Sequence, residues 1–228
     1  MGSLIEQRLR KTQIYAGLLQ ALPFVNCVLL NGSLATGRAK QGSDIDLLII
    51  TTDRRIFTAR FFVNSLLQVL GQKRPSLENK THSGKFCPNY FLNESFLKIP
   101  IGRGEKIDHY CADNYSRSVL VAGDKATFQQ FLSVNKALFA KSASFSSVEK
   151  DYRKILKVQF PIKPNSFVKI IKHLFETGLT GSFGEWLESK LKAWQIKKIT
   201  MDQRTKKYPN LIVFNDKELR FHPPSGKF

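Results

Sequence analysis

Cysteine, acidic side chains and long apolar runs are all scarce in this chain of 228 residues. Its 3 cysteines are an odd number without the spacing of a metal site. They exclude a disulfide scaffold and a structural zinc domain and favour a reducing compartment. Apolar runs such as Leu47–Ile50 are far shorter than the about 20 residues that a membrane helix needs. The first residues also lack the apolar core of a secretory signal. We therefore expect a cytoplasmic protein with no membrane span.

Acidic residues are outnumbered two to one, because the chain has 18 Asp and Glu but 36 Lys and Arg, a formal net charge of +18. The chain is also 42% hydrophobic and 11% aromatic, enough to bury a core and to exclude disorder. The charge points to a polyanion such as nucleic acid, or to a phosphate-rich substrate, with a solvated surface as the alternative. Residues 1–123 contain 16 basic and 9 acidic side chains, and residues 124–228 contain 20 and 9. We therefore expect any polyanion-binding surface mainly in the second part.

Apolar periodicity and end signals predict a mixture of helices and strands. The first helix has Ser3 as its N-cap and Glu6 at the capping-box position. Helices are predicted at 3–22, 54–70, 105–121, 127–139, 167–175 and 185–199, and strands at 24–30, 44–51, 85–92, 96–101 and 211–214, with room for two helical turns at 33–40. The segment 141–147 (KSASFSS) is the best linker candidate. We expect an α/β (α+β) fold with a core at residues 1–123 and a basic, mostly helical C-terminal region at 124–228.

Two short motifs that can bind phosphate and metal follow one another near the start of the chain. A strand that ends at Gly32-Ser33 and turns into a helix presents free backbone N–H groups and a hydroxyl, and glycine lets a phosphate come close to the backbone. Asp44 and Asp46 are two residues apart at the start of the next strand, so both carboxylates point to one side of it. They repel each other unless a cation lies between them, and oxygen ligands favour Mg²⁺. The combination is typical of phosphoryl or nucleotidyl transfer.

Gly32-Ser33 followed by Asp44-Ile45-Asp46 resembles the signature of the polymerase-beta-like nucleotidyltransferase superfamily. The resemblance is specific over about residues 24–52 and looser to about residue 123. It implies a mixed sheet flanked by helices, and transfer of a nucleoside monophosphate from an NTP to an acceptor with release of pyrophosphate. It also implies that Gly32 and Ser33 hold the β- and γ-phosphates, while Asp44 and Asp46 are the catalytic carboxylates that coordinate two Mg²⁺ ions.

Three further residues between the two motifs are assigned to nucleotide binding on the same resemblance, namely Arg38, Lys40 and Ser43. Arg38 and Lys40 would neutralise triphosphate charge. The alternative for both is an ordinary cation on a helix surface.

Active superfamily members usually carry a third carboxylate on a later strand, where it acts as the base for the acceptor hydroxyl. No such residue is evident in this sequence. On the strand expected at 85–92 the central polar residue is Asn89, which binds metal weakly and cannot act as a base near neutral pH. Asp108 is an alternative, although its neighbours place it on a helix, and Glu94 lies just past the strand. The third acid is therefore Asp108, Glu94 or absent.

The densest group of cations lies near the end of the chain, and we assign it to nucleic-acid binding because such a group can follow a phosphate backbone. A solvated face is the alternative. Trp186 and Trp194, eight residues apart on the same predicted helix, are expected to anchor it to the core rather than to stack on bases. The cations are Lys190, Lys197, Lys198, Arg204, Lys206 and Lys207.

These observations lead us to expect a magnesium-dependent, ATP- or other NTP-binding nucleotidyltransferase whose favoured acceptor is RNA. One alternative is a catalytically impaired nucleotide- or RNA-binding module. Another is an enzyme that transfers AMP to a protein partner, and a structural subunit is a third. An aminoglycoside acceptor is disfavoured, because a polycation would be repelled by a chain with a net charge of +18.

Overall fold

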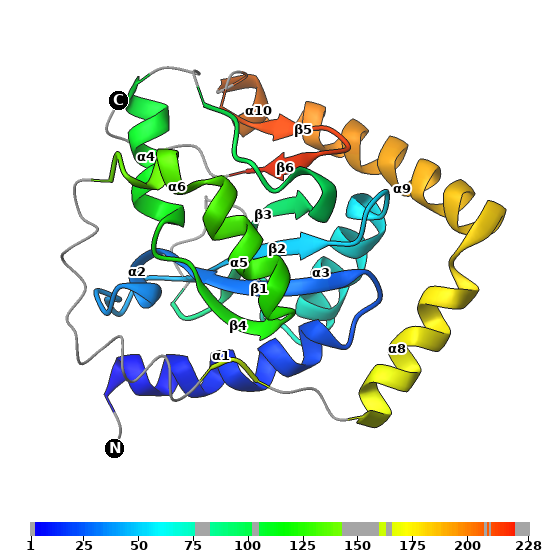
Figure 1. Ribbon diagram of the computed structural model, residues 1–228, viewed down its shortest axis with the longest axis horizontal. Helices are drawn as coiled ribbons and strands as arrows, with labels where there is room; N and C mark the ends of the chain where they lie inside the picture. The colour runs from blue at the N-terminus through cyan, green and yellow to red at the C-terminus, as the bar shows by residue number, and fades with distance from the viewer. Residues whose placement is uncertain are drawn as a thin grey trace.

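A mixed sheet of six strands forms the centre of the molecule (Figure 1). The computed structural model describes residues 3–75, 83–101, 105–142, 160–162, 166–207, 209 and 211–221. In the order β4-β1-β2-β3-β6-β5, only β2 and β3 are parallel neighbours, and the other pairs are antiparallel. The predicted mixed sheet is thus confirmed. The strands are β1 (Val25–Asn31), β2 (Ile45–Thr51), β3 (Phe86–Asn93), β4 (Val119–Gly123), β5 (Val213–Phe214) and β6 (Glu218–Arg220).

Both faces of this sheet are buried, which explains why β1 and β2 are apolar almost throughout. On one face Leu30 and Leu47 pack with Leu9 of α1 and Phe57 of α3. On the other face Leu29, Leu48 and Tyr90 pack with residues of α4, α5 and α6. The helices are α1 (Leu4–Gln20), α2 (Gly32–Ala35), α3 (Ile56–Val69), α4 (Glu105–Tyr115), α5 (Lys125–Val134), α6 (Lys136–Phe139), α8 (Ser166–Gly178), α9 (Gly181–Met201) and α10 (Gln203–Lys207), with a 3-10 turn, η1, at Glu94–Phe96. No helix in the described part of the chain is long and apolar enough to cross a membrane.

The first helix begins as predicted, since Ser3 and Glu6 form a reciprocal capping box. The helix predicted from residue 33 is shorter than expected, because α2 is a single turn that ends at Ala35. The helix predicted at 105–121 ends at Tyr115, and β4 begins four residues later. Apolar periodicity missed this break because helix and strand contribute to the same core cluster, α4 through Cys111 and β4 through Leu120.

The strand predicted at 96–101 is wrong. Leu97 and Ile99 are both buried, which produces the alternation typical of a strand. However, their backbone groups bond to one side chain instead of a neighbouring strand. Asn135 accepts from the Ile99 N–H at 2.8 Å and donates to the Leu97 carbonyl at 2.8 Å. A single buried amide therefore replaces the strand partner of this segment.

The second part of the chain shares the central sheet with the first. β6 pairs with β3, and α9 packs against α3. Sequence analysis did not predict β6, which is only three residues long, although the neighbouring β5 lies within the strand predicted at 211–214. The boundary between 1–123 and 124–228 stays a prediction, and most of the predicted linker lies outside the described residues.

The contact between α9 and α3 depends on one carboxylate. The N-terminus of α3 has no cap from its own flanking residue, Arg55. Glu188 of α9 instead accepts from the backbone N–H groups of Phe57, at 2.9 Å, and Thr58, at 2.8 Å. A carboxylate at this position also interacts favourably with the helix dipole. Glu188 thus caps a helix 130 residues away in the sequence.

We expect Glu188→Ala to lower the free energy of unfolding by about 1–2 kcal/mol, the usual effect of losing an N-cap. Urea denaturation followed by circular dichroism measures it. Lys190→Ala on the same helix, whose side chain is exposed, is the matched control and should leave stability unchanged. Equal stability of the two variants would show that Glu188 does not support α3.

Candidate active site

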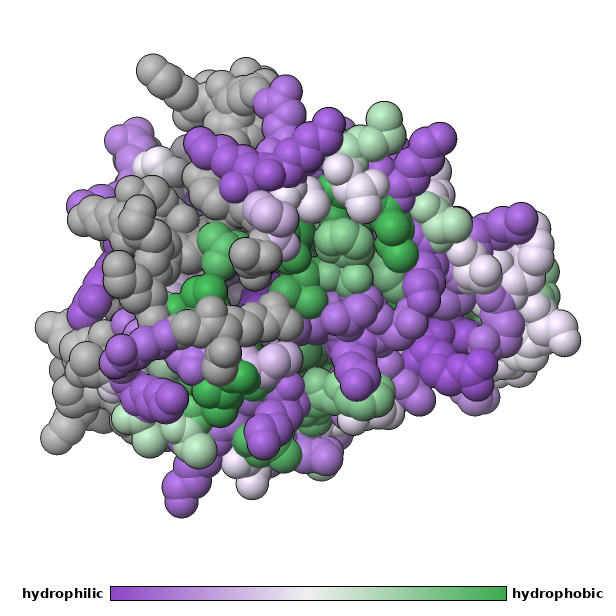
Figure 2. Space-filling view, turned by 90° about the horizontal axis from the view of Figure 1, so that it is seen from above, coloured by the Kyte–Doolittle hydropathy of each residue, from purple (hydrophilic) through white to green (hydrophobic). Residues whose placement is uncertain are grey.

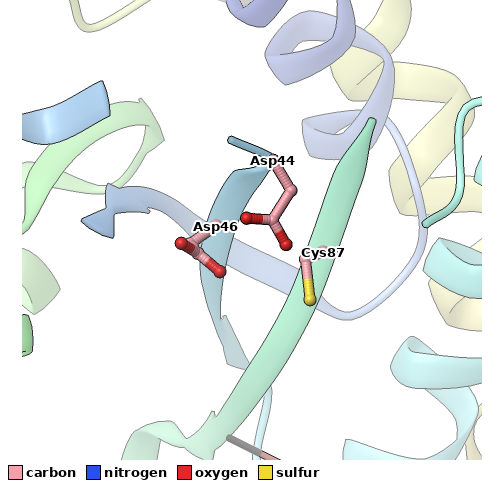
Figure 3. A group of neighbouring side chains, drawn as sticks. All are labelled: Asp44, Asp46 and Cys87. Atoms are coloured by element: carbon pink, nitrogen blue, oxygen red, sulfur yellow. The ribbon is translucent and has the colours of Figure 1, made fainter. Parts of the chain in front are cut away.

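Two aspartates and a cysteine converge at one end of the sheet (Figure 3). Asp44 directly precedes β2, Asp46 is its second residue, and Cys87 is the second residue of the neighbouring β3. Asp46 is paired with Cys87 in the sheet register. One ligand atom from each of the three lies within 4.8 Å of the others. The predicted proximity of the two carboxylates is therefore present, together with a thiol that sequence analysis did not select.

Gly32 touches this group through its backbone. It has a φ of +66°, and a Cβ at this position would lie 2.3 Å from Oδ2 of Asp46. Any other residue would be strained by the left-handed backbone and would clash with the carboxylate. The turn at Gly32-Ser33 therefore lies directly against Asp46.

Asp46 lies in an environment that disfavours its charge. The pKa of its carboxyl group is raised to about 7, mainly by removal from water and next by the negative charge of the nearby Asp44. The positive charge of Arg74 and a hydrogen bond from Asn89 act in the opposite direction. Two carboxylates held so close together need a cation to be charged at the same time.

Arg74 supplies one such cation. Its Nη1 atom donates to Oδ2 of Asp44 at 2.5 Å and lies 3.7 Å from the Cys87 sulfur. Its backbone N–H bonds to the carbonyl oxygen of Phe86, which holds the segment after α3 along β3. Sequence analysis missed Arg74, since nothing local distinguishes it from other loop cations.

The side chain on β3 that bonds to Asp46 is Asn89, which is not a carboxylate. Its Nδ2 atom donates to Oδ1 of Asp46 at 2.7 Å. Asp108 is buried on α4, lies 3.8 Å from Lys141 Nζ and does not belong to the group of Asp44, Asp46 and Cys87.

Glu94 lies past the opposite end of β3, where it accepts from the side chain of Asn26 and the backbone N–H of Asp53. Among the described residues, therefore, no third acid joins Asp44 and Asp46.

The donor atoms suit a hard divalent cation. Asp44 and Asp46 offer carboxylate oxygens, and the Oδ1 atom of Asn89 is buried without a hydrogen-bond partner in the described structure. Amide and carboxylate oxygens are the ligands that Mg²⁺ prefers. Burial raises the pKa of the Cys87 thiol, and both aspartates raise it further, so the thiol stays protonated and is a poor ligand for such an ion. Asp44, Asp46 and Asn89 therefore fit Mg²⁺ better than a thiophilic metal.

A buried arginine on α1 shapes the loop between the two motifs. Arg8 donates to the carbonyl oxygens of Lys40 and Gln41, both at 2.6 Å. The hydroxyl of Ser43 accepts from the backbone N–H of Lys40 at 3.0 Å. Ser43 thus closes this turn, while the side chains of Arg38 and Lys40 are exposed. The assignment of Arg38, Lys40 and Ser43 to nucleotide binding stays a prediction.

The C-terminal cations lie on α9 and α10. Arg204 is bound to Asp202 through two of its nitrogen atoms, at 3.0 and 2.7 Å, and the other five, Lys190, Lys197, Lys198, Lys206 and Lys207, are exposed. Figure 2 shows the molecule from above, where α10 and β5 lie in Figure 1, and hydrophilic side chains cover much of that face. The expectation that Trp186 and Trp194 are core anchors is wrong, since they are 54% and 47% exposed. Gly184, Gln195 and Ile199 are instead the buried residues of α9.

Comparison with known proteins supports the interpretation of the two motifs. Residues 16–93 match the family model of the nucleotidyltransferase domain. No curated protein sequence matches the chain. Four solved chains do, among them a structure described as a toxin-antitoxin with AMP-PNP, at 13% sequence identity and a TM-score of 0.34, covering 65% of this chain and 96% of that one.

The matched segment contains Gly32, Ser33, Asp44 and Asp46 together with the strands β1, β2 and β3 that hold them. The match to the nucleotidyltransferase domain, over residues 16–93, therefore includes both motifs and the strands that position them.

Proposed function

We propose that this protein transfers a nucleoside monophosphate from a magnesium-bound NTP to an acceptor hydroxyl, and that the acceptor is RNA. One observation carries the catalytic part of the proposal. The glycine turn that can approach a phosphate lies against Asp46, and Asp46 and Asp44 converge on one point. The triphosphate and the metal ligands would thus be held side by side.

Different residues would bind the phosphates and the metal ion. Backbone N–H groups and the hydroxyl at Gly32-Ser33 would hold the β- and γ-phosphates. Asp44 and Asp46, with Asn89, would hold magnesium, which neutralises charge on the phosphates and activates the acceptor hydroxyl when it is bound. The acceptor oxygen forms a bond to the α-phosphorus, the bond from that phosphorus to the bridging oxygen breaks, and pyrophosphate leaves. The acceptor proton passes to solvent, because no third carboxylate lies beside the pair in the described structure.

The charge distribution supports a polyanionic acceptor. Both acidic side chains of the long helix α9 bind other groups of the same molecule. Glu185 pairs with Arg54 and Arg55, both at 2.8 Å, and Glu188 caps α3. The lysines of the same helix, apart from Lys192, point to solvent. The outer surface of α9 is therefore cationic, which favours a phosphate backbone.

A protein acceptor is the second candidate, and the exposed face of α8 favours it. Ile170, Leu174 and Phe175 are 58%, 65% and 60% exposed. The opposite side of the helix is attached to the start of β1, where Lys172 donates to the Val25 carbonyl and Glu176 accepts from the Phe24 N–H. Figure 1 shows α8 at the margin of the molecule. Such an apolar face is typical of a site for another protein.

Replacement of either aspartate tests the catalytic proposal. With purified protein, Mg²⁺, total RNA and each radiolabelled NTP, we expect wild type to transfer label and Asp44→Asn or Asp46→Asn to lose on the order of 100-fold or more, because the metal loses a charged ligand. Asp216→Asn removes an acid that is 67% exposed and should keep wild-type activity. Label on a co-purifying protein instead of RNA would identify the second candidate, and no transfer to either would leave a nucleotide- or RNA-binding module.

Gly32→Ala tests the phosphate turn. The added methyl group would collide with the Asp46 carboxylate, so we expect the shift in melting temperature caused by Mg-ATP to disappear. Gly42→Ala is the matched control, because a Cβ there meets nothing within 4 Å. An unchanged Mg-ATP shift in a folded Gly32→Ala protein would contradict the assignment.

The pH dependence of stability tests the metal site without activity. The pKa of Asp46 is about 7 in the folded protein, against an ordinary value of 3.8, so between these values the folded state binds a proton that the unfolded state releases. Metal-free protein should therefore lose stability as pH rises from about 4 to about 7 through this group. Asp46→Asn should abolish that loss in urea titrations with EDTA, and Mg²⁺ should stabilise wild type but not the variant at pH 8. If stability changes with pH equally in Asp46→Asn and in the control Asp216→Asn, the raised pKa of Asp46 is contradicted.

A further inference from the structure

Four cations from distant parts of the sequence gather on the β3 side of the aspartates. We call this group the cationic surface: Arg60 of α3, Lys73 beside the first residue of β3, Lys198 of α9 and Arg204 of α10. Lys73 is close enough to the other three for each of them to lower its pKa, after the larger effect of burial. In the described structure the only ion pair in this group joins Arg204 to Asp202. Cations that lie close together are stabilised by a bound polyanion.

Arg60 has a side-chain nitrogen atom whose hydrogen-bonding capacity is not used among the described residues. Its Nη1 atom donates to the Gln195 side chain at 2.5 Å, and its guanidinium lies over the ring of Phe221, 4.5 Å from the centroid. Its Nε atom is buried without a hydrogen-bond partner in the described structure. Burial, with the charge of Arg204, lowers the pKa of Arg60 to about 10. A buried arginine without a carboxylate partner provides a fixed positive charge for a ligand.

A half-exposed tryptophan lies next to these cations. The Trp194 ring packs edge-on against Phe61, with centroids 6.2 Å apart, and Lys198 Nζ lies 4.2 Å from the Trp194 centroid. Lys190, Trp194 and Lys198 are spaced four residues apart, so they form one stripe along α9. Single-stranded nucleic acids bind where aromatic rings, on which their bases stack, lie beside cations that contact the backbone.

The cationic surface lies close to the catalytic aspartates. Arg204 is near enough to Arg74, the partner of Asp44, for the positive charge of Arg74 to affect its pKa. Phe221, under the guanidinium of Arg60, donates its backbone N–H to the Asn89 carbonyl at 2.8 Å. In the sheet, β3 lies on one side of β2, and β1 with its glycine turn lies on the other. The two sides of the aspartates therefore offer separate places for two anionic substrates.

We propose that the cationic surface binds the backbone phosphates of a single-stranded RNA acceptor, with a base stacked on Trp194, while the triphosphate occupies the Gly32-Ser33 side. This inference rests on the proposed function, which it deepens by assigning the acceptor to Arg60, Lys73, Trp194, Lys198 and Arg204. An acidic protein segment would match the charges but would leave the exposed tryptophan without a stacking partner.

The test is binding of a 5′-fluorescein-labelled single-stranded RNA of about 12 nucleotides, within the size range of single-strand sites. Fluorescence anisotropy is measured over a series of KCl concentrations. Loss of two phosphate contacts in Lys73→Gln/Lys198→Gln should reduce the slope of log K against log salt by about 1.4, at about 0.7 per contact for single strands. Trp194→Ala should weaken binding roughly tenfold without changing the slope.

The matched control is Lys125→Gln/Lys136→Gln, which removes two exposed lysines from α5 and α6, and it should bind RNA like wild type. Equal slopes for the two double variants, or RNA binding by neither wild type nor variants, would overturn the inference. So would tight binding of a fluorescent polyglutamate peptide that the RNA cannot displace.

Label transfer is measured separately on the same proteins. Transfer by wild type with an unaltered salt slope in Lys73→Gln/Lys198→Gln would contradict only the RNA-binding surface. An altered slope without any label transfer would contradict only the catalytic proposal.

Discussion

The close contact between the backbone of Gly32 and the carboxylate of Asp46 is the constraint on which the rest of the site depends. It brings the end of β1 and the start of β2 together so tightly that no side chain fits between them. Asp46 is thereby removed from water and placed beside a second carboxylate. A positive charge is then needed, and Arg74 provides one in the structure described here. A divalent cation with a triphosphate would provide more.

The motif residues could be predicted from sequence because they are close together along the chain. Gly32, Ser33, Asp44 and Asp46 lie within 15 residues of one another, just after the end of β1 and at the start of the adjacent β2, so local rules of turn and strand geometry suffice. The residues that complete the site come from elsewhere. Arg74 follows a helix, and Arg8 lies on α1 and holds the loop before Asp44. Their roles depend on tertiary contacts that no local pattern encodes.

The elements of the fold that were predicted wrongly also depend on tertiary contacts. Residues 97 and 99 are both buried, as in a strand, but Asn135, which lies between α5 and α6, supplies their hydrogen bonds. Trp194 occupies a helix whose apolar periodicity suggested a core anchor, yet α9 packs through Gly184, Gln195 and Ile199. Gly184 lies against the backbone of Leu179, Gln195 donates to the Phe57 carbonyl of α3, and both tryptophans stay about half exposed. Periodicity identified the helix correctly and its buried face wrongly.

The pairing of β6 with β3 affects how the molecule can form. Glu218 bonds to Tyr90 across 128 residues of sequence, so β3 gains its second neighbour only after almost the whole described chain is available. Contacts this distant slow folding, and an unpaired strand is a template for association with other chains. The Tyr90–Leu92 part of β3 therefore lacks its β6 partner until the intervening helices have been synthesised. Until then, the exposed backbone groups of this part of β3 can pair with a strand of another chain, so the arrival of β6 also protects β3 from association.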